Sequence, residues 1–195
     1  MNKLILASAS KRRKELLEQI GVYFSCMPMD IDETALPDEN AEAYVLRLAE
    51  QKALAALPNA NGLPVLGSDT CVLLGDEIMG KPESEHDAIE MLKRLSGKNH
   101  VVKTAVALCR EKDSKVQLCS EIVETQVSFS TLSDGQIMNY VKTGEPMDKA
   151  GAYGIQGRAA VFVNNINGSY SNVVGLPLAQ TARMLDKMGV EIWQY

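Results

Sequence analysis

The sequence predicts an α/β fold in which a mixed, twisted β-sheet carries flanking helices. Two observations lead to this prediction: short apolar runs typical of buried strands recur along the chain, and segments with helical apolar spacing lie between them. Chains that mix strands and helices in this way form layered α/β domains and not all-helical or all-β folds. The 195 residues are 46% hydrophobic, enough to fill one core, so we expect a single domain over residues 1–195.

Charge and cysteine content narrow the expected partners. The net charge is -5, and Lys and Arg are scattered except at residues 11–14, so we expect small anionic ligands and no nucleic-acid partner. The four cysteines lack CxxC spacing, and two histidines are too few to complete the usual zinc sites with them. No signal peptide is expected, because the apolar run near the N-terminus is too short for one, and no membrane span is expected, because no apolar run approaches the ~18 residues of a span. We therefore expect a cytoplasmic protein with reduced thiols and no membrane association.

An apolar run at residues 4–7 predicts a buried strand, and a helix capped by Ser8 or Ser10 follows it. Arg12 and Arg13 fall in the first turn of this helix, where the helix dipole disfavours cations. Guanidinium groups beside free backbone N–H groups form a concentrated anion site, so one interpretation is phosphate binding. The alternative is that both arginines only solvate the helix surface.

Residues 22–26 predict a second strand, and the acidic loop after it contains Glu33. One interpretation gives Glu33 a metal-binding role, and the other leaves the acids of this loop solvated.

In the helix expected over residues 41–57, Lys52 lies on the apolar stripe, so its side chain either extends to water or reaches a ligand. Arg47 is a similar but weaker candidate.

The most informative stretch is residues 65–82, where Asp69 interrupts a strand-like apolar run. A carboxylate in such a place needs a partner or a chemical role. After a turn at residues 75–77, residues 78–79 can pair back as a hairpin and bring Lys81 towards Asp69. The stretch therefore indicates a base or metal ligand that faces a cation.

The second half of the chain predicts scaffold elements around one small-residue loop. The pattern first indicates a helix ending before residue 97, a hairpin of 101–109 and 116–130, and a helix over 133–141. It then indicates a turn at 164–168 between 160–163 and 170–174, and a final helix over 177–188. Three glycines in residues 148–157 would let a ligand approach the backbone. There Gln156 either pairs with the edge of a nucleobase or forms a hydrogen bond that braces the loop.

Taken in order, a set of motifs resembles the Maf family of nucleoside triphosphate pyrophosphatases over nearly the whole chain. The set comprises residues 8–13, Glu33, Arg47, Lys52, residues 68–70, residues 80–82 and residues 154–157. The resemblance implies hydrolysis between the α- and β-phosphates of a nucleotide with Mg²⁺ or Mn²⁺, as a house-cleaning activity. It also implies an inosine triphosphatase-like fold with two lobes around a central cleft, and a homodimer. One departure is Lys11, where many members have proline.

The resemblance also implies a role for each candidate residue. Asp69 is the expected base and Glu33 the expected metal ligand, although the two carboxylates could exchange these roles or share the metal. The other substrate-binding candidates are Ser8, Ser10, Arg12, Arg13, Lys52 and Lys81 for the phosphates, and Thr70 and Gln156 for the base.

Arg12, Thr70 and Gln156 match the subgroup that acts on dTTP and UTP. Its substrates could include modified pyrimidine nucleotides. The subgroup that acts on 7-methyl-GTP typically carries Trp, Gln and Glu at these three places. Two alternatives stay open: a non-catalytic nucleotide-binding regulator of septum formation, and a plain phosphatase that releases orthophosphate.

Overall fold

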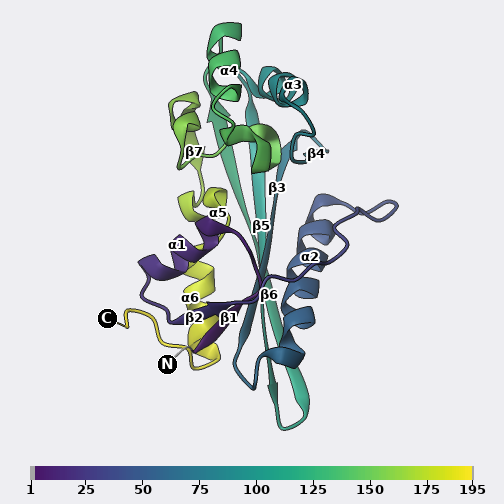
Figure 1. The fold of residues 1–195 in the computed structure, drawn as a ribbon, viewed down its shortest axis with the longest axis vertical. Coiled ribbons are helices and arrows are strands. Elements are labelled where there is room, and N and C mark those ends of the chain that lie inside the picture. Colours follow the sequence, from purple (N-terminus) through teal and green to yellow (C-terminus); the bar gives the residue numbers. More distant parts are fainter. Residues whose placement is uncertain (1–2, 195) are drawn as a thin grey trace. The chain divides into compact units, whose positions relative to one another are not determined.

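The computed structural model describes residues 3–194 and confirms the mixed α/β class (Figure 1). The strands are β1 (Leu4–Leu6), β2 (Phe24–Cys26), β3 (Val65–Leu74), β4 (Glu77–Met79), β5 (Asn99–Lys112), β6 (Lys115–Phe129) and β7 (Val163–Asn167). The α-helices are α1 (Lys11–Gln19), α2 (Ala41–Ala56), α3 (Glu85–Leu95), α4 (Asp134–Val141), α5 (Tyr170–Val174) and α6 (Leu178–Lys187). Short 3-10 helices are η1 (Leu57–Asn59), η2 (Glu145–Asp148), η3 (Ala150–Ala152) and η4 (Arg158–Phe162). None of the helices within residues 3–194 has the length and apolar character needed to cross a membrane.

The strands form one mixed sheet in the order β2-β1-β3-β5-β6-β7, with β4 beside β3. Strand β1 pairs in parallel with β2 and β3, whereas β4 pairs antiparallel with β3 and β7 pairs antiparallel with β6.

The chain divides into two compact units. Unit 1 comprises residues 3–69, Thr104–Val123 and 175–194, and unit 2 comprises Thr70–Lys103 and Glu124–Val174. The expected cleft stays a prediction.

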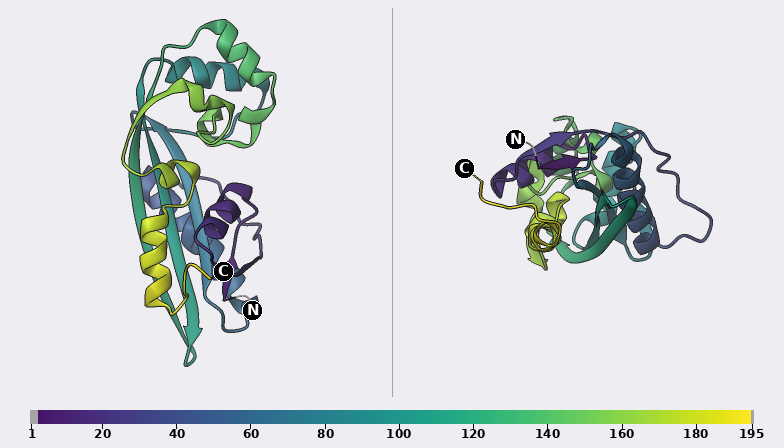
Figure 2. Two further views of the ribbon diagram at one scale, coloured as in Figure 1. Left: turned by 90° about the vertical axis from the view of Figure 1, so that its left-hand side faces the viewer. Right: turned by 90° about the horizontal axis from the view of Figure 1, so that it is seen from below.

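Unit 1 is built on a buried strand and two capped helices. Every residue of β1 is buried, as its apolar run predicts. The Ser10 hydroxyl accepts a hydrogen bond from the Arg13 backbone N–H at 3.4 Å and caps α1, while the Asn40 side chain caps α2 in the same way. In Figures 1 and 2, α2 lies on one side of the strands of this unit, and α1 and α6 lie on the other. The helix boundaries therefore follow from local capping signals.

Helix α2 packs directly on the backbone of β3 at Gly67. A Cβ atom at Gly67 would lie 2.1 Å from the Ala49 carbonyl oxygen and 2.7 Å from the Ala53 backbone nitrogen, closer than real atoms approach. Only glycine allows this contact. The contact brings the helix that carries Lys52 against the strand that carries Asp69.

Unit 2 contains an aromatic cluster and two helices, α3 and α4, that lie side by side (Figure 2). The rings of His100, Phe129 and Tyr153 meet edge to face, with centroids 4.7 to 5.3 Å apart. The His100 Nε2 atom lies 2.7 Å from the Tyr153 hydroxyl. Burial lowers the pKa of His100 to about 4, so the imidazole stays neutral near pH 7.

The turn expected at residues 164–168, between 160–163 and 170–174, is wrong. Residues 160–162 belong to η4, the strand β7 covers Val163–Asn167, and residues 170–174 form the helix α5. The Ser169 hydroxyl accepts the Asn172 backbone N–H at 3.3 Å, and the buried Asn172 amide donates to Thr125 Oγ1 at 2.9 Å. These contacts fix a helical turn in an apolar run too short for periodicity to separate helix from strand.

Replacing Gly67 with alanine should lower the free energy of unfolding by about 2 kcal/mol, because the added methyl group forces α2 away from β3. Urea denaturation measures this change. Gly80→Ala is the matched control, since a Cβ atom at Gly80 meets nothing within 4 Å. Equal stability of the two variants would contradict the close packing at Gly67.

Candidate active site

The ammonium group of Lys52 lies between two carboxylates. Its Nζ atom is 2.6 Å from Glu33 Oε1 and donates a hydrogen bond to Asp69 Oδ1 at 2.7 Å. The side chains of Lys52 and Asp69 are 10% and 12% exposed, whereas that of Glu33 is 48% exposed. Lys52 therefore does not extend to water; it binds the two acids that the sequence singled out, and its contact with a ligand stays a prediction.

Asp69 lies within β3, where residues 65–68 before it are buried and Thr70 after it is partly exposed. A carboxylate removed from water in this way needs a cation or hydrogen-bond donors. Lys52 provides the cation from the buried stripe of α2. The next residue back, Ser68, is fully buried and donates to the Gly175 carbonyl oxygen at 3.3 Å. The site is thus held to the body of unit 1.

Arg13 is built into the start of α1. Its Nε atom donates to the Gly175 carbonyl oxygen at 2.9 Å, and its Nη1 atom donates to the Ser8 hydroxyl oxygen at 3.2 Å. Burial lowers the pKa of Arg13, and the charges of Asp69 and Glu33 act in the opposite direction. These contacts overturn the interpretation of Arg13 as a purely solvated surface residue.

Ser8 and Ser10 join the same group through the backbone. The buried Ser8 hydroxyl oxygen accepts the Ser10 backbone N–H at 3.2 Å, and Ser10 caps α1. Arg12 follows in the first turn and is partly exposed. A helix N-terminus with serine hydroxyls and guanidinium groups is suited to a phosphate group.

Arg47 braces the loop that carries Glu33. Its Nε and Nη2 atoms donate to the two carboxylate oxygens of Glu39 at 2.6 and 2.7 Å, and Nη2 also donates to the Thr34 carbonyl oxygen at 3.1 Å. The Tyr44 hydroxyl donates to the Glu33 carbonyl oxygen at 3.0 Å. The Arg47 hydrogen bonds lower the pKa of Glu39 to about 2. Sequence analysis missed Glu39 and Tyr44, because only the folded loop brings them to their partners.

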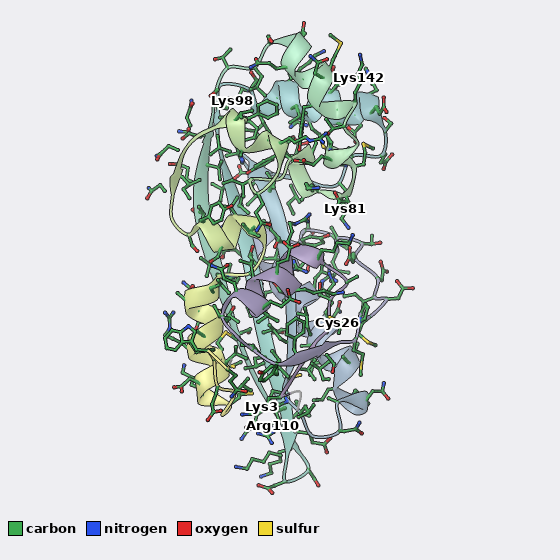
Figure 3. The ribbon with its side chains drawn as sticks, turned by 60° about the vertical axis from the view of Figure 1, so that its left-hand side comes forward. Lys3, Cys26, Lys81, Lys98, Arg110 and Lys142 are labelled. Carbon is green, nitrogen blue, oxygen red and sulfur yellow. The ribbon has the colours of Figure 1, made fainter. Side chains whose placement is uncertain are left out.

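Three predicted residues, Thr70, Lys81 and Gln156, belong to unit 2. Thr70 is partly exposed in β3, Lys81 is exposed on the segment after β4 (Figure 3), and Gln156 is exposed between η3 and η4. The side chains of Lys81 and Gln156 form no hydrogen bond with other residues in the range 3–194. Gln156 therefore does not brace its own loop, and the roles assigned to these three residues stay predictions.

The chemistry of Glu33 and Asp69 fits an open divalent-metal site, in which substrate and water complete the ligand set. Within residues 3–194, no group of three or more His, Cys, Asp or Glu side chains could enclose an ion. Mg²⁺ is commonly held by one or two carboxylates, with substrate phosphates and water as its other ligands. Two carboxylates that already share a cation fit such an open site and do not fit a closed protein cage.

Comparison with known proteins gives concordant matches along the chain. The family model described as "Maf-like protein" matches residues 3–188. A protein of Colwellia psychrerythraea named dTTP/UTP pyrophosphatase is 53% identical over 192 residues, which cover 96% of this chain and 89% of that protein. Proteins of the same name from Escherichia coli O157:H7 and Clostridium botulinum (strain Kyoto / Type A2) are 50% and 48% identical, covering 95% and 98% of this chain and 92% and 100% of their own lengths.

Replacing Lys52 with methionine should lower the free energy of unfolding at pH 7 by about 3 kcal/mol, because two neighbouring carboxylates lose their shared cation. Adding Asp69→Asn to this variant should restore part of the loss. Denaturant titration of both variants measures these changes, with the exposed Lys98→Met as control. If Lys52→Met costs no more than Lys98→Met, the ion pairs do not stabilise the fold.

Proposed function

Because the chain belongs to the Maf-like protein family, we propose that it is a nucleoside triphosphate pyrophosphatase that hydrolyses dTTP and UTP to the monophosphate and pyrophosphate. The observation that carries this proposal is about 50% identity, over almost the whole chain, with relatives named for that activity. The geometry of unit 1 supports it, since a buried acid, a shared cation and a helix start with serine hydroxyls and guanidinium groups occur together.

The residues of unit 1 have separate tasks in this reaction. A triphosphate carries about four negative charges near neutral pH, so catalysis depends on cations that face the phosphates. Arg12 and Arg13 bind phosphate oxygens beside the hydroxyls of Ser8 and Ser10, and Lys52 holds both carboxylates in place.

Asp69 acts as the base. A water oxygen forms a bond to phosphorus while the bridging phosphorus–oxygen bond between the α- and β-phosphates breaks. The proton of the water passes to Asp69, and the electron pair of the broken bond stays on the leaving oxygen. Glu33 and Asp69 would hold a divalent metal ion, and bound Mg²⁺ or Mn²⁺ would supply charge neutralisation on the phosphates and a lower pKa for water.

The unit 2 residues complete the proposal. The family resemblance assigns Lys81 to the phosphates, and it assigns Arg12, Thr70 and Gln156 to the preference for the base. A homodimeric, cytoplasmic enzyme without a nucleic-acid partner is also part of this proposal. The net charge of -5 supports the last point, and the homodimer rests on the family resemblance.

With Mg²⁺ present, the protein should release pyrophosphate from dTTP and UTP faster than from dCTP, dATP or dGTP. Asp69→Asn should lower kcat on the order of a hundredfold or more, since it removes the proton acceptor. Asp76→Asn, at an exposed carboxylate in the β3–β4 turn, is the control and should keep full activity. A coupled pyrophosphate assay measures all three proteins.

Three results would contradict the proposal in different ways. Undiminished release by Asp69→Asn would exclude that residue as the base. Release of orthophosphate in place of pyrophosphate would indicate a plain phosphatase. Saturable nucleotide binding without any product would indicate the non-catalytic regulator.

A further inference from the structure

Glu145, the first residue of η2, contacts the end of the loop that carries Gln156. Both of its carboxylate oxygens lie 3.0 Å from the backbone nitrogen of Arg158, and Oε1 also accepts the Tyr140 hydroxyl at 3.1 Å. Hydrogen bonds to an ionised carboxylate are stronger than neutral ones. The carboxylate therefore fixes the chain directly after residues 154–157, which we term the Gln156 loop.

Two glycines of the Gln156 loop make room for this arrangement. A Cβ atom at Gly157 would lie 2.2 Å from Glu145 Oε1, so any other residue would displace the carboxylate. A Cβ atom at Gly154 would lie 2.6 Å from Lys149 Cε. The Lys149 ammonium in turn donates to the Glu145 carbonyl oxygen at 2.7 Å. The loop backbone thus lies directly on the side chains that brace it.

The other end of the loop is fixed by Tyr153. Its buried hydroxyl pairs with His100 at 2.7 Å, and its ring packs against Phe129. Ile155 is buried as well, whereas Gln156 is exposed. The loop therefore has a fixed backbone at both ends and presents one outward amide that has no hydrogen-bond partner within residues 3–194.

We propose that Glu145 is a positioning residue that sets the base selectivity of the enzyme by fixing where the Gln156 amide stands. This inference rests on the proposed function. A purine presents its hydrogen-bonding edge farther from the sugar than a pyrimidine does. An amide on a fixed backbone meets only one of these edges, because its backbone cannot shift to reach the other. A loosened loop loses this discrimination while the reacting groups of unit 1 keep their contacts.

The test compares kcat/KM for dTTP and dGTP. Glu145→Ala should lower the dTTP:dGTP ratio on the order of tenfold, mainly through a higher KM for dTTP, with kcat nearly unchanged. Glu145→Gln should keep most of the selectivity, since its amide oxygen still accepts the Arg158 N–H. Gly157→Ala should reproduce the loss with every charge retained, and it carries the test if Glu145→Ala does not fold. Glu85→Ala, at an exposed carboxylate of unit 2, is the matched control.

The inference also predicts that Glu145 acts through Gln156. In the Gln156→Ala background, Glu145→Ala should cause no further loss of selectivity. An unchanged dTTP:dGTP ratio in both Glu145→Ala and Gly157→Ala would overturn the inference, as would equal losses on both nucleotides, which indicate a purely structural role. Wild-type protein that releases no pyrophosphate from any nucleotide would instead refute the proposed function, and the inference with it.

Discussion

The ammonium group of Lys52 joins the buried carboxylate of Asp69 to the half-exposed carboxylate of Glu33. Without this cation, Asp69 would be a buried charge with a second negative charge beside it, which is unfavourable in a medium of low dielectric constant. The contact depends in turn on Gly67, where α2 meets the backbone of β3. Packing and charge therefore act together: the glycine sets how close helix and strand approach, and the lysine makes that approach electrostatically stable.

Two loops that carry candidate residues lack long secondary structure, and charged side chains fix both of them. The fork of Arg47 joins Glu39 to the backbone of the Glu33 loop. In the Gln156 loop, the Glu145 carboxylate binds the backbone N–H of the residue that follows. Charge-assisted hydrogen bonds of this kind restrict a loop without a core of its own. Site residues on such loops can be held in place and still remain exposed.

Local signals made much of the fold predictable from the sequence. Ser10 caps the first helix, and the turn at residues 75–77 precedes β4, as expected. The partners of Lys52 could not be derived in this way, because Asp69 is 17 positions away and reaches it only when α2 packs on β3. The helix α5 was missed for the same reason, since Thr125 contributes to its start from 44 to 47 positions away. Contacts between distant residues leave no periodic signal.

The central claim is that Glu33, Lys52 and Asp69 act as one unit in nucleotide hydrolysis. The most direct test is a double-mutant cycle on kcat/KM for dTTP with Glu33→Gln and Asp69→Asn. The account predicts strong coupling, so that the double variant is little worse than the more impaired single variant. Losses that multiply, as they do for independent residues, would contradict it.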